Sequence, residues 1–302
     1  KKEREPIDFL SKKKVFFTIS LVLIAAGVIT IGVNAGRGNG AFAYSLEFQG
    51  GTSTNVTFDK DYSIDEIDKE IVPVVEKVTG DNNVQTQKVA GTNQVIIKTV
   101  TLDLDKREAL NKAMVDNFGV DESKITAENI SSTVSNEMRR DAVIAVVIAT
   151  ICMLLYIWFR FKDIRFATSA VLALLHDVLV VVGFYAIARI SVGNTFIACM
   201  LTIVGYSINA TIVIFDRIRE EMRGKTKSSD VAAVVNKSIT QTLTRSIYTS
   251  LTTFIMVAVL YVMGVSSIKE FALPLMVGVV CGAYSSVCIT GALWYVMKRF
   301  KK

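Results

Sequence analysis

Side chains that carry catalysis or bind metals are scarce in this sequence. It has one histidine and four cysteines in 302 residues, and residues 34–141, its one long polar block, contain neither type. This absence excludes a disulfide framework and a His-based catalytic pair from the block. The cysteines lie in apolar stretches without metal-ligand spacing, and we expect them to pack as small apolar residues: Cys152, Cys199, Cys281 and Cys288. No catalytic residue, metal or cofactor is predicted.

Outside that block, the sequence contains long apolar runs without charged residues. The chain is 51% hydrophobic, with a mean hydropathy of +0.42. Six segments are long and apolar enough to cross a bilayer, at about 20 residues each: 15–33, 142–159, 166–188, 194–215, 246–264 and 271–297. The first follows three lysines but lacks a small-x-small cleavage site, so we expect a retained span. The sequence predicts a polytopic α-helical membrane protein, with domain 34–141 between helix 1 and the five-helix region 142–302.

Basic residues gather on one side of these spans. They fill the tail 1–14, the turn after the second span, the loop 216–245 and the C-terminus, whereas 34–141 has 12 basic and 18 acidic residues, a net charge of −6. Because Lys and Arg accumulate in cytoplasmic segments, we expect both termini in the cytoplasm and 34–141 outside. The net positive charge of the chain then reflects its orientation in the membrane, and no nucleic-acid partner is predicted.

The polar block reads as a small α+β domain. Residues 44–58 predict a strand interrupted at Gly50-Gly51, and Ser63 to Glu66 predict a capping box that opens a helix. Two strands, a second helix and a last strand follow. The order β-α-β-β-α-β is that of the ferredoxin-like split unit. We expect a docking or substrate-handling surface here.

Polar residues inside the spans are candidates for function because they are costly in lipid. His176 and Asp177 lie at the centre of the third span, Asn209 in the fourth, and Arg245 at the mouth of the fifth. Asp177 is either a structural hydrogen-bond partner or a proton-titrating carboxylate with His176 as its relay. Adjacent residues point about 100° apart on a helix, so we expect the two to face different surroundings. Arg245 is either a cytoplasmic anchor or the partner of a polar group in the bundle.

Small and polar residues form ladders along the last three spans. Gly205, Ser207 and Asn209 predict close helix contact with one polar interhelical bond. Similar ladders run along the fifth and sixth spans: Ser246, Thr249, Ser250, Thr252 and Thr253, then Gly278, Gly282, Ser285 and Ser286. The residues themselves predict a tightly packed, transporter-like bundle.

Several motifs resemble those of the SecF family, which is related to the RND transporters. They occur in the same order and topology along almost the whole chain: EFQGGT (Glu47–Thr52), EMRRDA (Glu137–Ala142), YIWFRF (Tyr156–Phe161), ALLHDV (Ala173–Val178), VGYSIN with IVIFDRIRE (Val204–Glu220) and QTLTRSIYTSLTT (Gln241–Thr253). The resemblance implies a non-enzymatic subunit of the bacterial export machinery in the cytoplasmic membrane. It implies pairing with SecD, association with the SecYEG channel and with YajC, and use of the proton motive force on unfolded secretory chains.

The resemblance also implies where the proton acts, and here the sequence departs from it. The family places an acid after Ser-Ile-Asn and an arginine in Thr-Leu-x-Arg. Arg245 matches the arginine, but Ala210 stands at the acid position. Alanine carries no proton, so three explanations stay open: an introduced replacement, coupling moved to Asp177 or to SecD, or an uncoupled scaffold. A small-molecule RND-type carrier is the remaining alternative.

Overall fold

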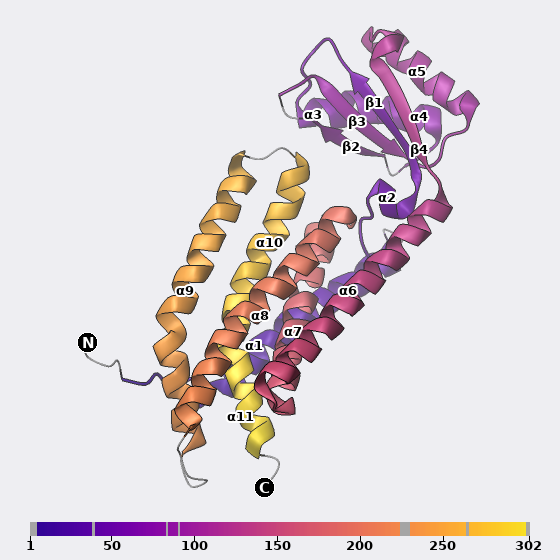
Figure 1. The fold of residues 1–302 in the computed structure, drawn as a ribbon. Coiled ribbons are helices and arrows are strands. Elements are labelled where there is room, and N and C mark those ends of the chain that lie inside the picture. The colour runs from indigo at the N-terminus through magenta and orange to yellow at the C-terminus, as the bar shows by residue number, and fades with distance from the viewer. Residues whose placement is uncertain are drawn as a thin grey trace.

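The computed structural model describes residues 5–37, 40–82, 84–89, 91–223, 230–263 and 266–299, without the side chains of Glu47, Ser132, Ser266 and Ser267. It has two parts, a bundle of long helices and a small α/β unit at one end (Figure 1). Six described helical stretches are long and apolar enough to cross a membrane. They are α1 (Lys13–Gly36), α6 (Ser132–Phe161), α7 (Ile164–Ala188), α8 (Asn194–Met222), α9 (Val231–Met263), and α10 (Ser266–Tyr284) with η3 (Ser285–Thr290) and α11 (Gly291–Arg299). The prediction of six apolar helices is confirmed.

The helices extend beyond the apolar segments. Helix α6 starts ten residues before position 142, where the predicted second span starts. The predicted loop 216–245 is wrong as a loop, because α8 continues to Met222 and α9 starts at Val231; residues 224–229 lie outside the described chain. Hydropathy marks only the apolar part of a helix. The polar turn at the end of α8 is stabilised by Arg217, which pairs with Glu220 at 2.6 Å and Glu221 at 2.9 Å.

The α/β unit contains one four-stranded antiparallel sheet, with strand order β2-β3-β1-β4. Its strands and helices follow one another as β-α-β-β-α-β, as the sequence predicts. They are β1 (Gly51–Thr57), α3 (Ile64–Glu66), η1 (Ile67–Ile71), α4 (Val72–Thr79), β2 (Gln85–Lys88), β3 (Gln94–Thr99), α5 (Leu104–Phe118), η2 (Glu122–Lys124) and β4 (Ile125–Ile130). Alternate β1 and β3 residues such as Val56 and Ile97 pack against Ile71, Val75 and Leu110 from the helices.

The capping box at the start of α3 is present. Glu66 N–H donates to Ser63 Oγ at 3.4 Å, and Ser63 N–H donates to the Glu66 carboxylate at 2.8 Å. Hydrogen bonds from Lys60 and from Ser63 lower the pKa of Glu66 to about 2. The acid therefore stays ionised and holds the helix start at neutral pH.

The strand predicted over 44–58 is wrong in its first half. Residues Leu46–Gln49 form a short helix, α2, and β1 begins only at Gly51. Gly50 and Gly51 have φ angles of 77° and 143°, so the chain turns at this pair instead of continuing as a strand. Polar–apolar alternation favours a strand here, but it does not register the turn that the glycine pair introduces.

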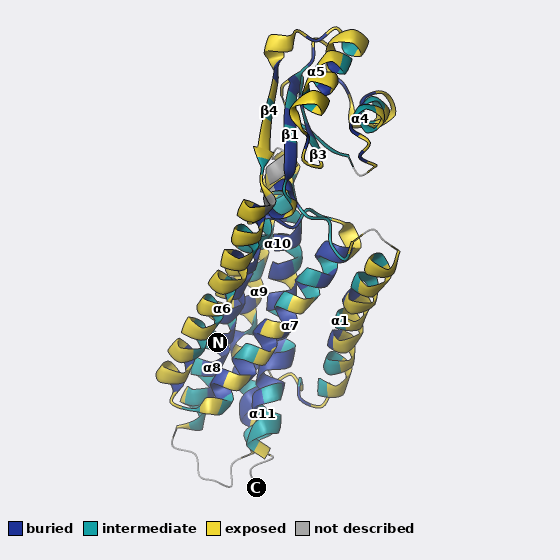
Figure 2. Cartoon of the chain, turned by 90° about the vertical axis from the view of Figure 1, so that its right-hand side faces the viewer, coloured by how far each residue is buried: buried dark blue, intermediate teal, exposed yellow. Residues whose placement is uncertain are grey.

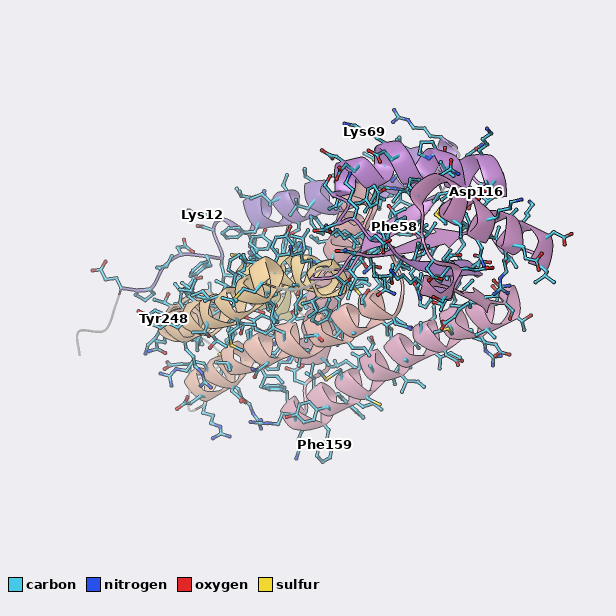
Figure 3. The ribbon with its side chains drawn as sticks, turned by 90° about the horizontal axis from the view of Figure 1, so that it is seen from above. Lys12, Phe58, Lys69, Asp116, Phe159 and Tyr248 are labelled. Atoms are coloured by element: carbon cyan, nitrogen blue, oxygen red, sulfur yellow. The ribbon has the colours of Figure 1, made fainter. Side chains whose placement is uncertain are left out.

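Two connections hold the α/β unit to the bundle. Ser131 alone separates β4 from α6, which runs on into the bundle. On the other side, the connector after α1 pairs with the α7–α8 turn: Ser45 N–H donates to Val192 O at 3.0 Å, and Val192 N–H donates to Ala43 O at 2.7 Å. The outer sides of α1 and α6 are exposed, while α7 and α10 are largely buried (Figure 2). Seen from above, exposed Phe159 and Tyr248 lie towards the rim of the bundle (Figure 3).

Helix α1 meets α7 through two glycines, Gly27 and Gly183. A Cβ on Gly183 would lie 2.8 Å from Gly27 Cα, and one on Gly27 would lie 2.7 Å from Gly183 Cα. The backbones therefore touch, as small residues allow in membranes.

We expect Gly183→Ala to force α1 away from α7. The new methyl group meets backbone, which no rotamer change relieves, so we expect a loss of about 1–3 kcal/mol, typical of overpacking. Thermal unfolding in detergent measures it. Gly32→Ala on α1, where nothing lies within 4 Å of the new Cβ, is the control and should leave the midpoint unchanged or slightly raised. Equal midpoints for the two variants would contradict the glycine contact.

Candidate functional site

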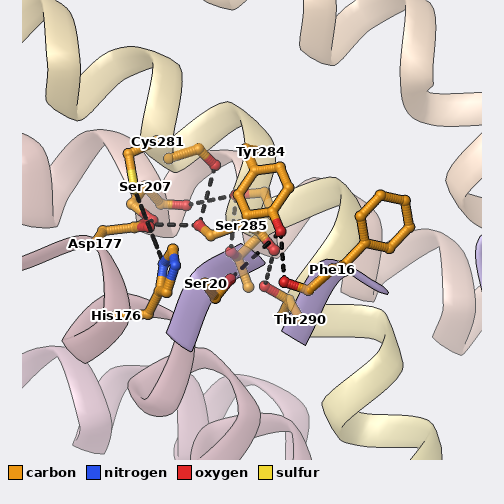
Figure 4. A network of polar contacts seen from close by, with 12 residues as sticks. Phe16, Ser20, His176, Asp177, Ser207, Cys281, Tyr284, Ser285 and Thr290 are labelled. Carbon is orange, nitrogen blue, oxygen red and sulfur yellow. Dashed lines mark hydrogen bonds and ion pairs between the residues drawn. The ribbon is translucent and has the colours of Figure 1, made fainter. Parts of the chain in front are cut away.

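A buried carboxylate lies where three helices of the bundle meet. Asp177 on α7 has no exposed surface. Its Oδ2 accepts hydrogen bonds from Ser207 Oγ of α8 at 2.5 Å and Ser285 Oγ of η3 at 2.7 Å. Its Oδ1 accepts from Cys281 Sγ of α10 at 3.3 Å and lies 2.9 Å from His176 Nδ1 (Figure 4). Four polar side chains thus satisfy one carboxylate in an otherwise apolar bundle.

His176 and Asp177 do not face different surroundings, so that expectation was wrong. Both side chains are buried, and the imidazole turns back so that Nδ1 contacts the neighbouring carboxylate. The two Cα–Cβ bonds point about 100° apart, but the side-chain torsion angles bring the imidazole and the carboxylate together. The other ring nitrogen, Nε2, is buried without a hydrogen-bond partner.

The sixth membrane helix changes its winding at this site. Residues Ser285–Thr290 form a π-helix, in which Thr290 Oγ1 donates to Ser285 O at 3.0 Å. Single π turns inside α-helices occur frequently at functional sites. Next to it, Tyr284 Oη donates to Phe16 O of α1 at 2.7 Å and lies 3.4 Å from Ser20 Oγ, which extends the network to α1. The network therefore links α1, α7, α8 and the sixth span.

Sequence reasoning missed part of this network. The ladder prediction included Ser207 and Ser285, but Cys281 was expected to pack as an apolar residue, and Tyr284 and Ser20 were not singled out. The available signal was spacing: Tyr284 and Ser285 lie three and four residues after Cys281, which places both on the side of the helix that carries Cys281.

His176, Asp177 and Cys281 are also the described residues that could hold a metal ion, because their ligand atoms all lie within 4.8 Å of one another. The direct contacts of 2.9 and 3.3 Å to Asp177 Oδ1 are those of hydrogen bonds. The two serine hydroxyls already occupy Oδ2. The geometry fits a hydrogen-bonded carboxylate better than a coordination site.

The remaining predicted residues lie apart from this network. Asn209 on α8 and Arg245 on α9 are exposed, and Ala210 is half-buried. Gly205 is exposed, and a methyl group placed on it would meet nothing within 4 Å, so the close helix contact expected there does not occur within the described chain.

Two contacts fix the heights of these residues along α8 and α9. Tyr206 Oη donates to Ser250 Oγ at 2.7 Å, and Arg217 Nε donates to Gln241 Oε1 at 2.7 Å. Since the helices run antiparallel, Ala210 and Arg245 lie within about one turn of the same height. Exposed polar residues of the two helices form what we call the α8–α9 polar face: Asn209, Arg245, Tyr248, Thr249 and Thr252.

Six apolar helices around a buried carboxylate–imidazole pair, with an α/β unit at one end, define a polytopic membrane protein built like a transporter. The profile of the family "Protein export membrane protein SecD/SecF, C-terminal" matches residues 110–300. The chain belongs to the SecD/SecF family of protein export membrane proteins.

Individual relatives agree along the whole chain. Protein translocase subunit SecF of Petrotoga mobilis is 36% identical over 98% of both chains. Protein translocase subunit SecDF of Bacillus subtilis is 36% identical over 96% of this chain, which covers 38% of that longer protein.

The fold matches solved SecDF structures. The crystal structure of SecDF from Thermus thermophilus, described as a translocon-associated membrane protein, aligns with a TM-score of 0.81 at 30% identity. The alignment covers 99% of this chain and 40% of that one. SecDF in its super-membrane-facing form aligns with a TM-score of 0.69 at 31% identity, covering 99% and 39%. This chain therefore corresponds to one part of the longer SecDF chains.

Proposed function

We propose that this protein is an auxiliary subunit of the Sec export machinery that acts with SecD to promote late steps of protein translocation across the cytoplasmic membrane. The observation that carries the proposal is full-length similarity to SecF, combined with a polar face that one chain leaves uncovered. The threonine hydroxyls of this face donate to carbonyls of their own helix, but an arginine facing lipid would be costly, so the α8–α9 polar face requires a partner.

The partner that fits is the SecD half. In SecDF the two halves belong to one chain, of which this chain matches about two fifths. A second helix bundle placed against the α8–α9 polar face would cover Asn209 and Arg245 and bring Ala210 towards the junction of the halves. Association with the SecYEG channel and with YajC follows from the same role, with an unfolded secretory polypeptide as substrate.

Asp177 is the group proposed to respond to the proton motive force. It is a carboxylate deep in the bundle, it touches elements of three spans, and His176 provides a relay beside it. Uptake of a proton would remove its capacity to accept four hydrogen bonds, and the contacts with Ser207 and Ser285 would weaken. A proton at Asp177 would therefore loosen α7 from α8 and η3.

The α/β unit is proposed to be a ferredoxin-like domain on the extracytoplasmic side, with both termini in the cytoplasm. The strand order supports the ferredoxin-like fold, and the clustering of basic residues on the opposite side of the spans supports the orientation. It would meet the emerging polypeptide.

Export into inverted membrane vesicles under an imposed pH gradient tests the function. Vesicles that lack the protein should export several-fold more slowly than vesicles that contain it, and the gradient should accelerate only the latter. Unchanged export on removal of the protein would reject the proposal.

An uncoupled assembly scaffold is a second candidate, because Ala210 occupies the position of the family's acid. Ala210→Asp places a carboxylate at the height of Arg245 and separates the two functions. If Asp177 already couples export to the pH gradient, export by the parent protein depends on the gradient, and Ala210→Asp adds no new dependence. A parent indifferent to the gradient, with dependence appearing only in Ala210→Asp, would favour the scaffold.

A further inference from the structure

An apolar groove lies at the end of the bundle that carries the α/β unit. It has a volume of about 380 Å³ and is formed by α6, α7, α8 and the connector that follows α1. Its walls are aliphatic and aromatic side chains, and Arg139 of α6 is the one charged residue among those that line it. Ligand pockets of proteins have volumes of roughly 300–1,000 Å³. The groove is therefore large enough for a ligand of mainly apolar character.

Arg139 has hydrogen-bonding capacity that the protein leaves unused. Its guanidinium stacks over the Tyr44 ring, 4.7 Å from the centroid, and its Nε is buried without a hydrogen-bond partner. Glu137 and Asp141 lie two positions away on the same helix and therefore point to other sides of it, and within the described residues no ion pair joins either of them to Arg139. A stacked guanidinium keeps its planar fork of donors fixed, and that fork matches a phosphate.

The groove and the arginine follow one stripe of α6. Arg139, Val143 and Val147 are spaced by four residues, so they line one side of the helix over about 12 Å. Val182 of α7 and Phe196 of α8 continue the apolar wall opposite. The cation lies at the end nearest the α/β unit, and the apolar walls extend from it into the bundle. A negative headgroup above a hydrocarbon chain has the complementary layout.

We propose that this groove binds an anionic phospholipid of the leaflet next to the α/β unit, with its phosphate on Arg139 and one acyl chain between α6, α7 and α8. Charge complementarity selects this occupant. A partner helix in the same place would have to bury a carboxylate opposite Arg139, whereas the lipid supplies its negative charge at the membrane surface.

Native mass spectrometry of the purified full-length protein, with equimolar phosphatidylglycerol and phosphatidylcholine, tests the proposal. Both lipids carry a phosphate, but the choline ammonium offsets its charge in phosphatidylcholine, so we expect retention of phosphatidylglycerol over phosphatidylcholine by about tenfold. Arg139→Gln should abolish this preference and Arg139→Lys should keep part of it. The matched control Arg140→Gln removes an exposed charge from the next position and should keep all of it. Val143→Trp fills the groove and should lower retention of both lipids.

Three results would overturn the assignment. They are a parent protein without lipid preference, an equal loss in Arg139→Gln and Arg140→Gln, and unchanged lipid retention in Val143→Trp. Loss of a co-purified protein from Val143→Trp with lipid retention intact would show that a partner protein occupies the groove instead. The thermal midpoint of each variant establishes that it is folded.

Discussion

Asp177→Ala is expected to destabilise the bundle by about 3–5 kcal/mol, because it leaves buried polar groups without their partner. The substitution removes the acceptor shared by Ser207, Ser285, Cys281 and His176. Each donor left unpaired in an apolar bundle costs about 1–3 kcal/mol, reduced where a hydroxyl turns to a backbone carbonyl. Ser285 has that option, because its Oγ already lies 3.3 Å from Gly282 O. Thermal unfolding in detergent should show a large drop in midpoint.

Asp177→Asn separates stability from coupling. The amide has the size of the carboxylate and keeps one acceptor oxygen, so we expect a smaller loss of stability than in Asp177→Ala. It cannot take up a proton at neutral pH, so export should lose its dependence on the gradient. Ser285→Ala is the matched control: it removes one donor, should cost about 1 kcal/mol, and should keep gradient dependence. Gradient-dependent export by a folded Asp177→Asn protein would show that the proton acts elsewhere.

Gly51→Ala is expected to destabilise the α/β unit by about 3 kcal/mol. Gly51 has a φ of 143°, and a Cβ there would overlap the Thr99 carbonyl oxygen and lie 2.8 Å from Leu46 Cδ1. Thr99 belongs to the neighbouring strand β3, so the clash is with backbone. Moving β1 to relieve it would disturb Thr52, whose Oγ1 accepts a hydrogen bond from Leu102 N–H at 2.8 Å.

Gly80→Ala is the control for conformation alone. Gly80 also has a positive φ, 73°, but nothing lies within 4 Å of the added Cβ, so only the left-handed backbone is penalised, at about 1–2 kcal/mol. Hydrogen exchange of the β1 and β3 amides in the full-length protein measures both variants. If Gly80→Ala accelerated exchange as much as Gly51→Ala, close packing at Gly51 would not be the cause.

Local patterns in the sequence sufficed for the six apolar helices, for the order of elements in the α/β unit and for the capping box at Ser63. Each of these features depends on residues that are close together in the sequence, and the periodicity of apolar residues indicates such local structure directly. Helix ends were less predictable. The polar turns of α8 before Met222 continue as helix because Arg217 pairs with acids three and four residues on, which hydropathy does not register.

The site needed long-range information that the sequence pattern does not contain. Asp177 and Ser207 were recognisable as polar residues in apolar spans, but their contact depends on how α7 crosses α8. Cys281 meets Asp177 across more than a hundred residues, and nothing in its apolar neighbours distinguishes it from Cys152. The Gly27–Gly183 contact could not be predicted from the sequence for the same reason, since a single glycine in a helix does not indicate which helix it contacts.

The uninterrupted course of α6 has a mechanical consequence. Its 30 residues, Ser132–Phe161, contain neither glycine nor proline, so the helix has no built-in hinge over roughly 45 Å. A tilt of about 10° at its far end would therefore displace the base of β4 by roughly 8 Å. With only Ser131 between them, strand and helix would move together as one lever arm, and a sweep of this size would also have to break the pairing of Ser45 and Ala43 with Val192.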